Sequence, residues 1–342
     1  MQEMQDNLQK IANAYQTLQQ MPDVQVGQTP KTEVWKDGKV KLYRYEPTNP
    51  IKTTIPVLIN YALVNRYEMM DLQSDRSFMK NLLDAGIALY ILDYGYPTMA
   101  DQYNTMEDYL NWIDDAVEYI HTTHKISQVN LMGICQGGTF ATIYAALYPQ
   151  KVKNLVTLVA PFDFSTNEGL LFSWSKSMDI DKMVDGYRNI PGSFLNTGFD
   201  MLKPMMKINK MKGLTDMLEE PSKAENFMRM EKWIADSPDQ AGECFRKFVK
   251  DLYQGNKLIK GEFEIFGRIV NLKDITMPLL NIYATEDHLV PPASTIPLND
   301  YVGSKDKELY KFAGGHIGVF VGGRSQKELA PAVSSWLLTR DK

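Results

Sequence analysis

One cysteine of this chain has the surroundings of a catalytic nucleophile. Cys135 lies within residues 133–138, GICQGG, between an apolar run and an amphipathic run. This is the context of a strand, a sharp turn and a helix, and small residues are needed where that turn crowds the backbone. The positive end of the helix favours the thiolate form of the cysteine. The pattern predicts acyl transfer through Cys135, with the backbone N–H of Gln136 directed at the developing oxyanion. The alternative is a buried cysteine in a glycine turn.

Two later residues complete a candidate triad. Asp287 follows an apolar run that ends at Ala284, and His316 follows the last strand-like run between small residues. The order nucleophile, acid, histidine is that of the α/β-hydrolase fold. In this scheme His316 takes the thiol proton, and Asp287 holds the imidazole tautomer and stabilises the imidazolium. Glu286 is the competing candidate for the acid, and His288 lies near the site but is misplaced to be the base.

The second oxyanion donor is less constrained by the sequence. We expect it from the loop after the apolar run 55–61, at Leu63 or Val64. This loop lacks the His-Gly-Gly-Gly form found in many esterases. The sequence therefore leaves the choice between the two residues open.

Alternating strand-like and helix-like runs must position these residues. Such alternation implies βα units and a parallel sheet. We predict strands at 39–46, 55–61, 87–92, 128–134, 154–159, 278–284 and 308–312, and helices at 74–85, 106–121 and 139–147. The run Ser325–Glu328 resembles a capping box that opens a last helix, interrupted or restarted at Pro331.

The alternation of strand-like and helix-like runs stops between residues 165 and 273. This stretch is rich in Met, Phe and Trp, and we predict that it is mostly helical. We predict an α/β-hydrolase fold with a mostly parallel central sheet flanked by helices and a helical cap insertion. The expected organisation is an N-terminal helical segment (1–30), a core (31–164 and 274–342) and the cap insertion (165–273). An apolar stripe in residues 1–20 indicates a helix that packs on its own domain or docks a partner.

Composition narrows the class of protein. The chain has 342 residues and a net charge of −5, which argues against a nucleic-acid binder. The sequence has no secretory signal and no apolar stretch long enough to span a membrane, so we expect a cytoplasmic protein. No cysteine and histidine cluster has metal-ligand spacing, and we expect neither a metal nor a cofactor. His121 and His124 are expected to be exposed or capping, and Cys244 to be a packed small residue.

Several segments together resemble the polyhydroxyalkanoate synthases. The family's lipase-like box matches GICQGG, and the resemblance extends over residues 39–338. The other matching segments are 61–66 (YALVNR), 71–77 (DLQSDRS), 230–234 (MEKWI), 236–242 (DSPDQAG), 287–292 (DHLVPP) and 314–318 (GGHIG). The short chain is similar to the class III synthases, with class IV second, and these need a second, different subunit. Tyr94 departs from the family, which usually has Trp between Asp93 and Gly95.

The resemblance implies a reaction and its partners. The family polymerises (R)-3-hydroxyacyl-CoA thioesters and releases CoA, with the growing chain held as a thioester on the residue that matches Cys135. It implies that His316 activates the thiol and that Asp287 helps to activate the incoming 3-hydroxyl through His316. We expect a short-chain substrate such as 3-hydroxybutyryl-CoA, a homodimer joined by a second synthase subunit that touches residues 1–20, and association with the polyhydroxyalkanoate granule surface.

Other interpretations of the same residues remain. A thioesterase or a dienelactone-hydrolase-like enzyme would use the same triad, and a degenerate fold would only bind. Four lysines lie among apolar residues of the insertion, at Lys203, Lys207, Lys210 and Lys212. They indicate either a solvated helix face or contact with the granule surface or the CoA phosphates.

Overall fold

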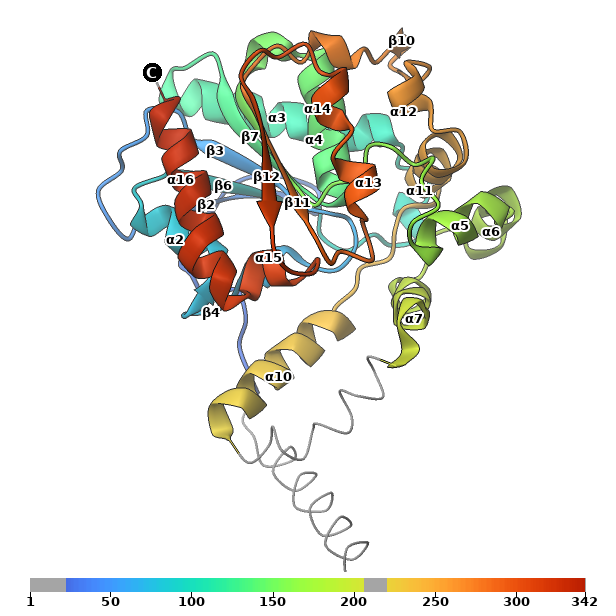
Figure 1. Ribbon diagram of the computed structural model, residues 1–342, viewed down its shortest axis with the longest axis horizontal. Coiled ribbons are helices and arrows are strands. Elements are labelled where there is room, and N and C mark those ends of the chain that lie inside the picture. The colour runs from blue at the N-terminus through green and yellow to red at the C-terminus, as the bar shows by residue number, and fades with distance from the viewer. Residues whose placement is uncertain (1–22, 206–219, 342) are drawn as a thin grey trace, which may run out of the picture.

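The computed structural model describes residues 23–205 and 220–341, and an eight-stranded sheet forms its centre (Figure 1). The strand order is β1-β2-β6-β3-β7-β8-β11-β12. Only β1 and β2 run antiparallel to their neighbours; the other pairs are parallel. The strands are β1 (Lys31–Asp37), β2 (Val40–Tyr45), β3 (Val57–Asn60), β6 (Leu89–Asp93), β7 (Val129–Ile134), β8 (Val152–Leu158), β11 (Leu279–Ala284) and β12 (Lys307–Phe312).

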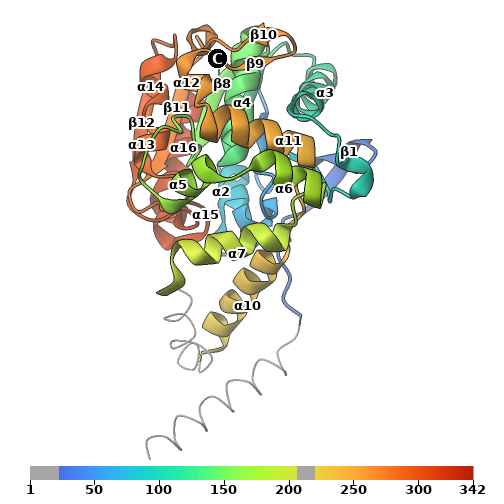
Figure 2. The same cartoon turned by 90° about the vertical axis from the view of Figure 1, so that its right-hand side faces the viewer.

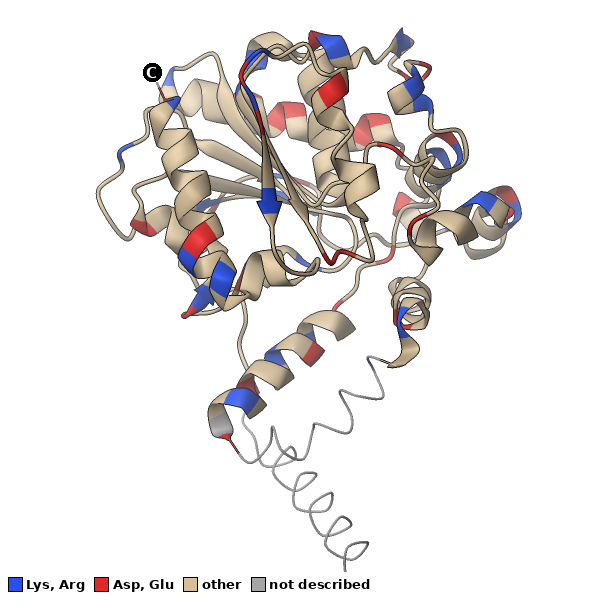
Figure 3. Cartoon of the chain, viewed as in Figure 1, with Lys and Arg blue, Asp and Glu red and all other residues tan. Residues whose placement is uncertain are grey.

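Helices cover both faces of this sheet, as an α/β-hydrolase fold requires. The apolar residues of α3 (Met106–His124) and α4 (Gln136–Leu147) share one core cluster, and those of α2 (Phe78–Asp84), α15 (Gly318–Val321) and α16 (Ala330–Thr339) share another. Because side chains alternate along a strand, β7 sends Leu131 into the first cluster and Met132 into the second. The inner strands β3, β7 and β11 carry no charged residue (Figure 3).

The described part of segment 165–273, called the insertion below, is mostly helical, as expected, and its helices lie beside and below the core (Figures 1 and 2). The described helices are α5 (Leu170–Ser177), α6 (Ile180–Tyr187), α7 (Gly192–Leu202), α10 (Pro221–Ala235), α11 (Gly242–Lys247), a π-helix (Phe248–Gln254) and α12 (Lys257–Lys260). A small hairpin, β9 (Glu264–Ile265) and β10 (Arg268–Ile269), follows them and was not predicted. Short α13 (Pro292–Thr295) and α14 (Leu298–Tyr301) separate β11 from β12.

Two local predictions were wrong. The helix expected from residue 74 begins at Phe78, because β4 (Asp71–Gln73) and β5 (Arg76–Ser77) form a hairpin and Ser77 then caps the helix through the Lys80 amide. The capping box at Ser325 does not form. The Ser325 hydroxyl donates instead to the carbonyl of Val319, and residues 325–329 are a π-helical turn that leads into α16.

Some predictions fall on residues outside the described ranges. The apolar stripe in residues 1–20 is one, and Lys207, Lys210 and Lys212 are others. In the part of the chain that the structure describes, no helix combines the length and the apolar character that crossing a membrane requires. No group of three or more His, Cys, Asp or Glu residues there could hold a metal ion.

Candidate active site

Cys135 occupies a strained turn between β7 and α4. Its backbone has φ 51° and ψ −126°, a conformation that costs energy for a residue with a side chain. The turn is held because the Cys135 amide donates to the carbonyl of Leu158 in β8 over 2.9 Å. The side chain is partly exposed, so the thiol is accessible at the end of the strand.

The glycines of GICQGG are explained by close backbone approaches around this turn. A Cβ on Gly133 would lie 2.5 Å from the Cα of Gly138, and one on Gly138 would lie 2.4 Å from the Cβ of Ala160. A Cβ on Gly137 would lie 2.4 Å from the carbonyl oxygens of Asn60 and Tyr61. The contacts at Gly133 and Gly137 are with backbone atoms, which cannot give way. The elbow therefore packs directly on the chain that follows β3.

Asp287 and His316 lie together at the same edge of the sheet, after β11 and β12. The Nδ1 atom of His316 is 2.6 Å from Oδ2 of Asp287, whose side chain is 0% exposed. The other carboxylate oxygen accepts from the amides of Leu289 at 2.9 Å and Val290 at 2.8 Å. These bonds orient the carboxylate and leave Nε2 of the imidazole for the cysteine.

Electrostatics favour the protonated form of His316. Burial alone would lower the pKa of His316, but the Asp287 carboxylate and then Cys135 raise that pKa well above its ordinary value. Hydrogen bonds to Asp287 and to Cys135 act in the same direction. The arrangement can therefore accept the thiol proton and hold it as an imidazolium between two negative groups.

The two residues that flank Asp287, Glu286 and His288, do not share its bond to His316. Among the described residues, Glu286 makes no side-chain bond to His316; its backbone amide binds the carbonyl of Gly314. His288 is half-buried, and its pKa is lowered by burial first and then by the positive charge of Lys203. Lys203, the described member of the lysine group, thus acts electrostatically on the residue beside Asp287.

The predicted oxyanion donors differ in availability. The Leu63 amide donates to Oε1 of the Gln136 side chain at 3.2 Å, so it is engaged in this structure. The amides of Gln136, Val64 and Ala62 have no acceptor among the described residues. Gln136 is therefore placed for two tasks, since its N–H is available and its side chain holds the loop opposite.

Sequence comparisons show related chains of nearly the same length. A family model described as alpha/beta hydrolase fold matches residues 55–322. The chain is 47% identical to the poly(3-hydroxyalkanoate) polymerase subunit PhaC of Thiocystis violacea, over 99% of this chain and 96% of that one. Its identity to the PhaC subunit of Allochromatium vinosum is also 47%, over 99% and 97%. The chain belongs to the PhaC family.

Solved structures with much lower sequence identity share the fold of this chain. The monoacylglycerol lipase of Paleococcus ferrophilus aligns over 87% of this chain and 99% of its own, with a TM-score of 0.53 and 16% identity. At that identity the likeness shows the shared α/β-hydrolase fold alone.

Two residues that support the elbow of this PhaC-family chain were missed at the sequence level. The Asn60 side chain donates to the carbonyl of Gly137 at 2.9 Å and accepts from the Tyr94 hydroxyl at 2.6 Å. Asn60 ends an otherwise apolar strand and is fully buried, so an isolated amide at that position was a signal that could have been noticed. Tyr94, noted only as a departure from the family's Trp, thereby becomes part of the elbow's support.

A third missed residue comes from the insertion. Tyr253 lies on the π-helix and packs against the rings of Phe164, Phe172 and Phe248. Burial raises the pKa of its hydroxyl, and the charge of Cys135 raises it further. Such π-helical turns often mark functional sites. The insertion thus brings an aromatic cluster close to Cys135.

Proposed function

We propose that this chain polymerises (R)-3-hydroxyacyl-CoA thioesters into polyhydroxyalkanoate and releases CoA. The observation that carries the proposal is the 47% identity to polymerase subunits over nearly the whole chain. The position of Cys135 beside the His316–Asp287 dyad is consistent with it.

The proposed mechanism begins with transfer of the acyl group to sulfur. His316 accepts the thiol proton of Cys135 at Nε2, and the thiolate attacks the thioester carbonyl. The tetrahedral oxyanion collapses, the carbon–sulfur bond to CoA breaks, and the CoA thiolate takes the proton from the imidazolium. One thioester replaces another, so the acyl group stays activated on Cys135.

The second half of the cycle forms the ester bond. His316 accepts the proton of an incoming 3-hydroxyl, whose oxygen attacks the Cys135 thioester. Collapse of this second intermediate releases the thiol, which regains its proton from His316. Asp287 keeps Nδ1 protonated throughout and stabilises the imidazolium, and the Gln136 N–H is one oxyanion donor.

In this proposal the insertion serves as a cap that excludes water. A synthase differs from a thioesterase in whether water reaches the acyl-enzyme before the hydroxyl does. The rings of Phe140 in the core and of Phe164, Phe172, Phe248 and Tyr253 form one connected aromatic cluster that supports such a seal. A crowded site of this kind favours short acyl chains such as 3-hydroxybutyryl.

The proposed setting follows the family. It comprises a cytoplasmic enzyme at the granule surface, a homodimer and a second synthase subunit that touches residues 1–20, with no cofactor beyond the CoA of the substrate. The PhaC relatives are themselves called polymerase subunits, which supports a multi-subunit enzyme. Lys203 and its neighbouring lysines are proposed to face the granule or the CoA phosphates.

The decisive experiment incubates the purified protein with (R)-3-hydroxybutyryl-CoA, with and without the partner subunit. Free CoA and insoluble polyester are both measured, and Cys135→Ala is the control. We expect CoA release with polymer, both lost in the variant. CoA release with only free 3-hydroxybutyrate would assign a thioesterase instead, and no release with the partner present would contradict the proposal.

A further inference from the structure

The loop at residues 61–66, which we call the oxyanion loop, has no helix or strand hydrogen bonds of its own. It connects β3 to the short helix at Tyr67–Met70 and contains the candidate donors opposite Cys135. Donors of this kind must be held within about 0.5 Å of the productive position. Its geometry must therefore be imposed by neighbouring groups.

The core fixes one end of the loop through a buried ion pair. Arg66 is bound at both of its terminal nitrogens by Asp93, at 2.6 and 2.7 Å, and its guanidinium lies over the rings of Tyr67 and Tyr96. Asp93 also accepts from the Gly95 amide at 2.9 Å. The side chain of Arg66 is thus anchored in the core, and its carbonyl faces elsewhere.

The insertion binds that same end of the loop by directed hydrogen bonds. The indole N–H of Trp233, at the end of α10, donates to the Arg66 carbonyl at 2.6 Å. The side-chain amide of Asn65 donates to the carbonyl of Ile234 at 3.3 Å. Asn65 has φ 55°, so the loop accepts a strained residue where this bond forms. The Tyr96 ring covers the Arg66 guanidinium, and the Tyr96 hydroxyl donates to Asp236 at 2.7 Å.

The middle of the loop is linked to the insertion through the Gln136 side chain. The side-chain oxygen of Gln136 accepts a hydrogen bond from the Leu63 amide. The Nε2 atom of Gln136 lies 3.5 Å from the side-chain oxygen of Gln240. A small cavity of about 30 Å³ lies between loop residues, the chain at the end of β6, and Pro238 and Asp239 of the insertion. The hydrogen bonds of Trp233 and Asn65 therefore link the loop to the insertion beside a space that is only partly filled.

We propose that Trp233 and Asn65 are positioning residues that hold the oxyanion loop in its catalytic geometry. Stabilisation of the transition state at Cys135 then depends on the insertion being seated on the core. α10 lies below the sheet with its C-terminal end nearer the core (Figures 1 and 2), and this end carries Trp233 and Ile234, which contact the loop. The proposal rests on acyl transfer at Cys135 but not on the polymer product.

Two reactions of the same sulfur separate this role from a general structural one. Acylation by p-nitrophenyl butyrate passes through an oxyanion and releases p-nitrophenolate. Alkylation by iodoacetamide displaces iodide at a saturated carbon and forms no oxyanion. Both rates are measured at Cys135 on the full chain, with Cys135→Ala as the blank, and modification of Cys135 is verified by peptide mass spectrometry.

The variants remove single donors and keep the local shape. Trp233→Phe keeps an aromatic ring and removes the indole N–H, and Asn65→Gly keeps the positive φ without strain. We expect each to lower the acylation rate by about 10-fold and the pair by about 100-fold, with alkylation changed by less than about twofold. The matched control is Asn196→Ala, which removes the other donor to the Ile234 carbonyl, at 2.7 Å, from within the insertion. It should change neither rate by more than about twofold.

Three outcomes would overturn the proposal. Equal losses in acylation and alkylation would mean that the variants damage the triad or the fold. No loss in either would mean that the core alone holds the loop. If the wild-type protein were alkylated but never acylated, Cys135 would not perform acyl transfer, on which the proposal rests. A wild-type protein that is acylated but makes no polymer would instead contradict the proposed function and leave this test intact.

Discussion

Asp287 in the core and Asp181 in the insertion each pair with a basic side chain at 2.6 Å, yet the first side chain is 0% exposed and the second is 50% exposed. Asp287 is bound by two main-chain amides in addition to His316. Asp181 is bound by the long side chains of Arg246 and Lys250. The same distance therefore describes two different kinds of interaction.

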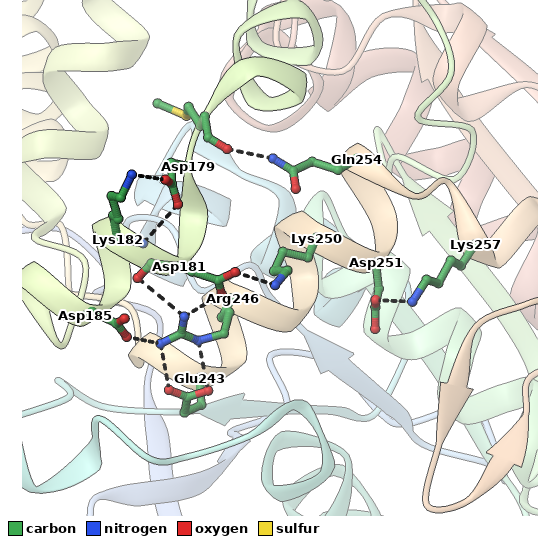
Figure 4. A network of polar contacts seen from close by, with 11 residues as sticks. Asp179, Asp181, Lys182, Asp185, Glu243, Arg246, Lys250, Asp251, Gln254 and Lys257 are labelled. Atoms are coloured by element: carbon green, nitrogen blue, oxygen red, sulfur yellow. Dashed lines mark hydrogen bonds and ion pairs between the residues drawn. The ribbon is translucent and has the colours of Figure 1, made fainter.

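The insertion's network joins α6 to α11 and the π-helix (Figure 4). Arg246 contacts Asp181, Asp185 and Glu243, and Lys250 contacts Asp181. Exposed pairs of long side chains contribute little, because water and salt screen them and ordering costs entropy. The Asp287 carboxylate is held by backbone amides, whereas the Asp181 carboxylate is held by long side chains beside the buried apolar cluster of Ile180, Val184, Ile190 and Val249.

The largest effect is expected from Asp287→Asn. The amide can still fill the site, but it favours the wrong imidazole tautomer and does not stabilise the imidazolium, so acylation of Cys135 should fall by about 10²- to 10⁴-fold. The rate is followed by CoA release from the acyl-CoA. Glu286→Gln, one residue earlier, is the matched control and should stay within about threefold of wild type. A larger loss in the Glu286 variant would exchange the roles of the two acids.

An intermediate effect is expected from Glu68→Gln, in the short helix that follows the oxyanion loop. Burial raises the pKa of Glu68 even though Arg66 opposes the shift, and one carboxylate oxygen has no hydrogen-bond partner among the described residues. A carboxyl whose folded pKa is raised stabilises the fold at low pH, and that contribution is lost as the pH rises through the folded pKa.

At neutral pH the Gln variant should therefore be more stable than wild type. Its advantage should disappear below about pH 4, where Glu is protonated in both states. Denaturant unfolding at several pH values measures the difference. An advantage that is unchanged with pH would show that ionisation of Glu68 is not its cause.

The smallest effect is expected from Arg246→Met, which keeps the apolar stem and removes the charge at the centre of the network. Melting temperature should fall by no more than about 2 °C in low salt, and by less in about 0.5 M salt. Lys182→Gln removes the neighbouring pair with Asp179 and should be nearly silent. A fall in melting temperature of several degrees that does not depend on salt would contradict the contrast between Asp287 and Asp181.

Much of the candidate site could be predicted because local motifs impose it. The elbow GICQGG requires a small residue where Gly137 meets the carbonyls of Asn60 and Tyr61. The glycines that meet this requirement can be recognised in the sequence. The places of Asp287 and His316 follow from strand order, since parallel strands end at one edge. The capping box at Ser325 was mispredicted because the Ser325 hydroxyl donates to the carbonyl of Val319, a contact that the local pattern does not reveal.

By itself, the sequence determined the fold class and pointed to Cys135 as the candidate nucleophile, followed along the chain by a candidate acid and histidine, because periodicity and turn chemistry act between near neighbours. Only the tertiary structure decided that Leu63 donates to the Gln136 side chain, that Asn60 and Tyr94 support the elbow, and that Trp233 reaches Arg66 across 167 positions of the chain. The reason is physical: a hydrogen bond depends on the distance between two atoms, and contacts between distant segments are set by how the whole core packs.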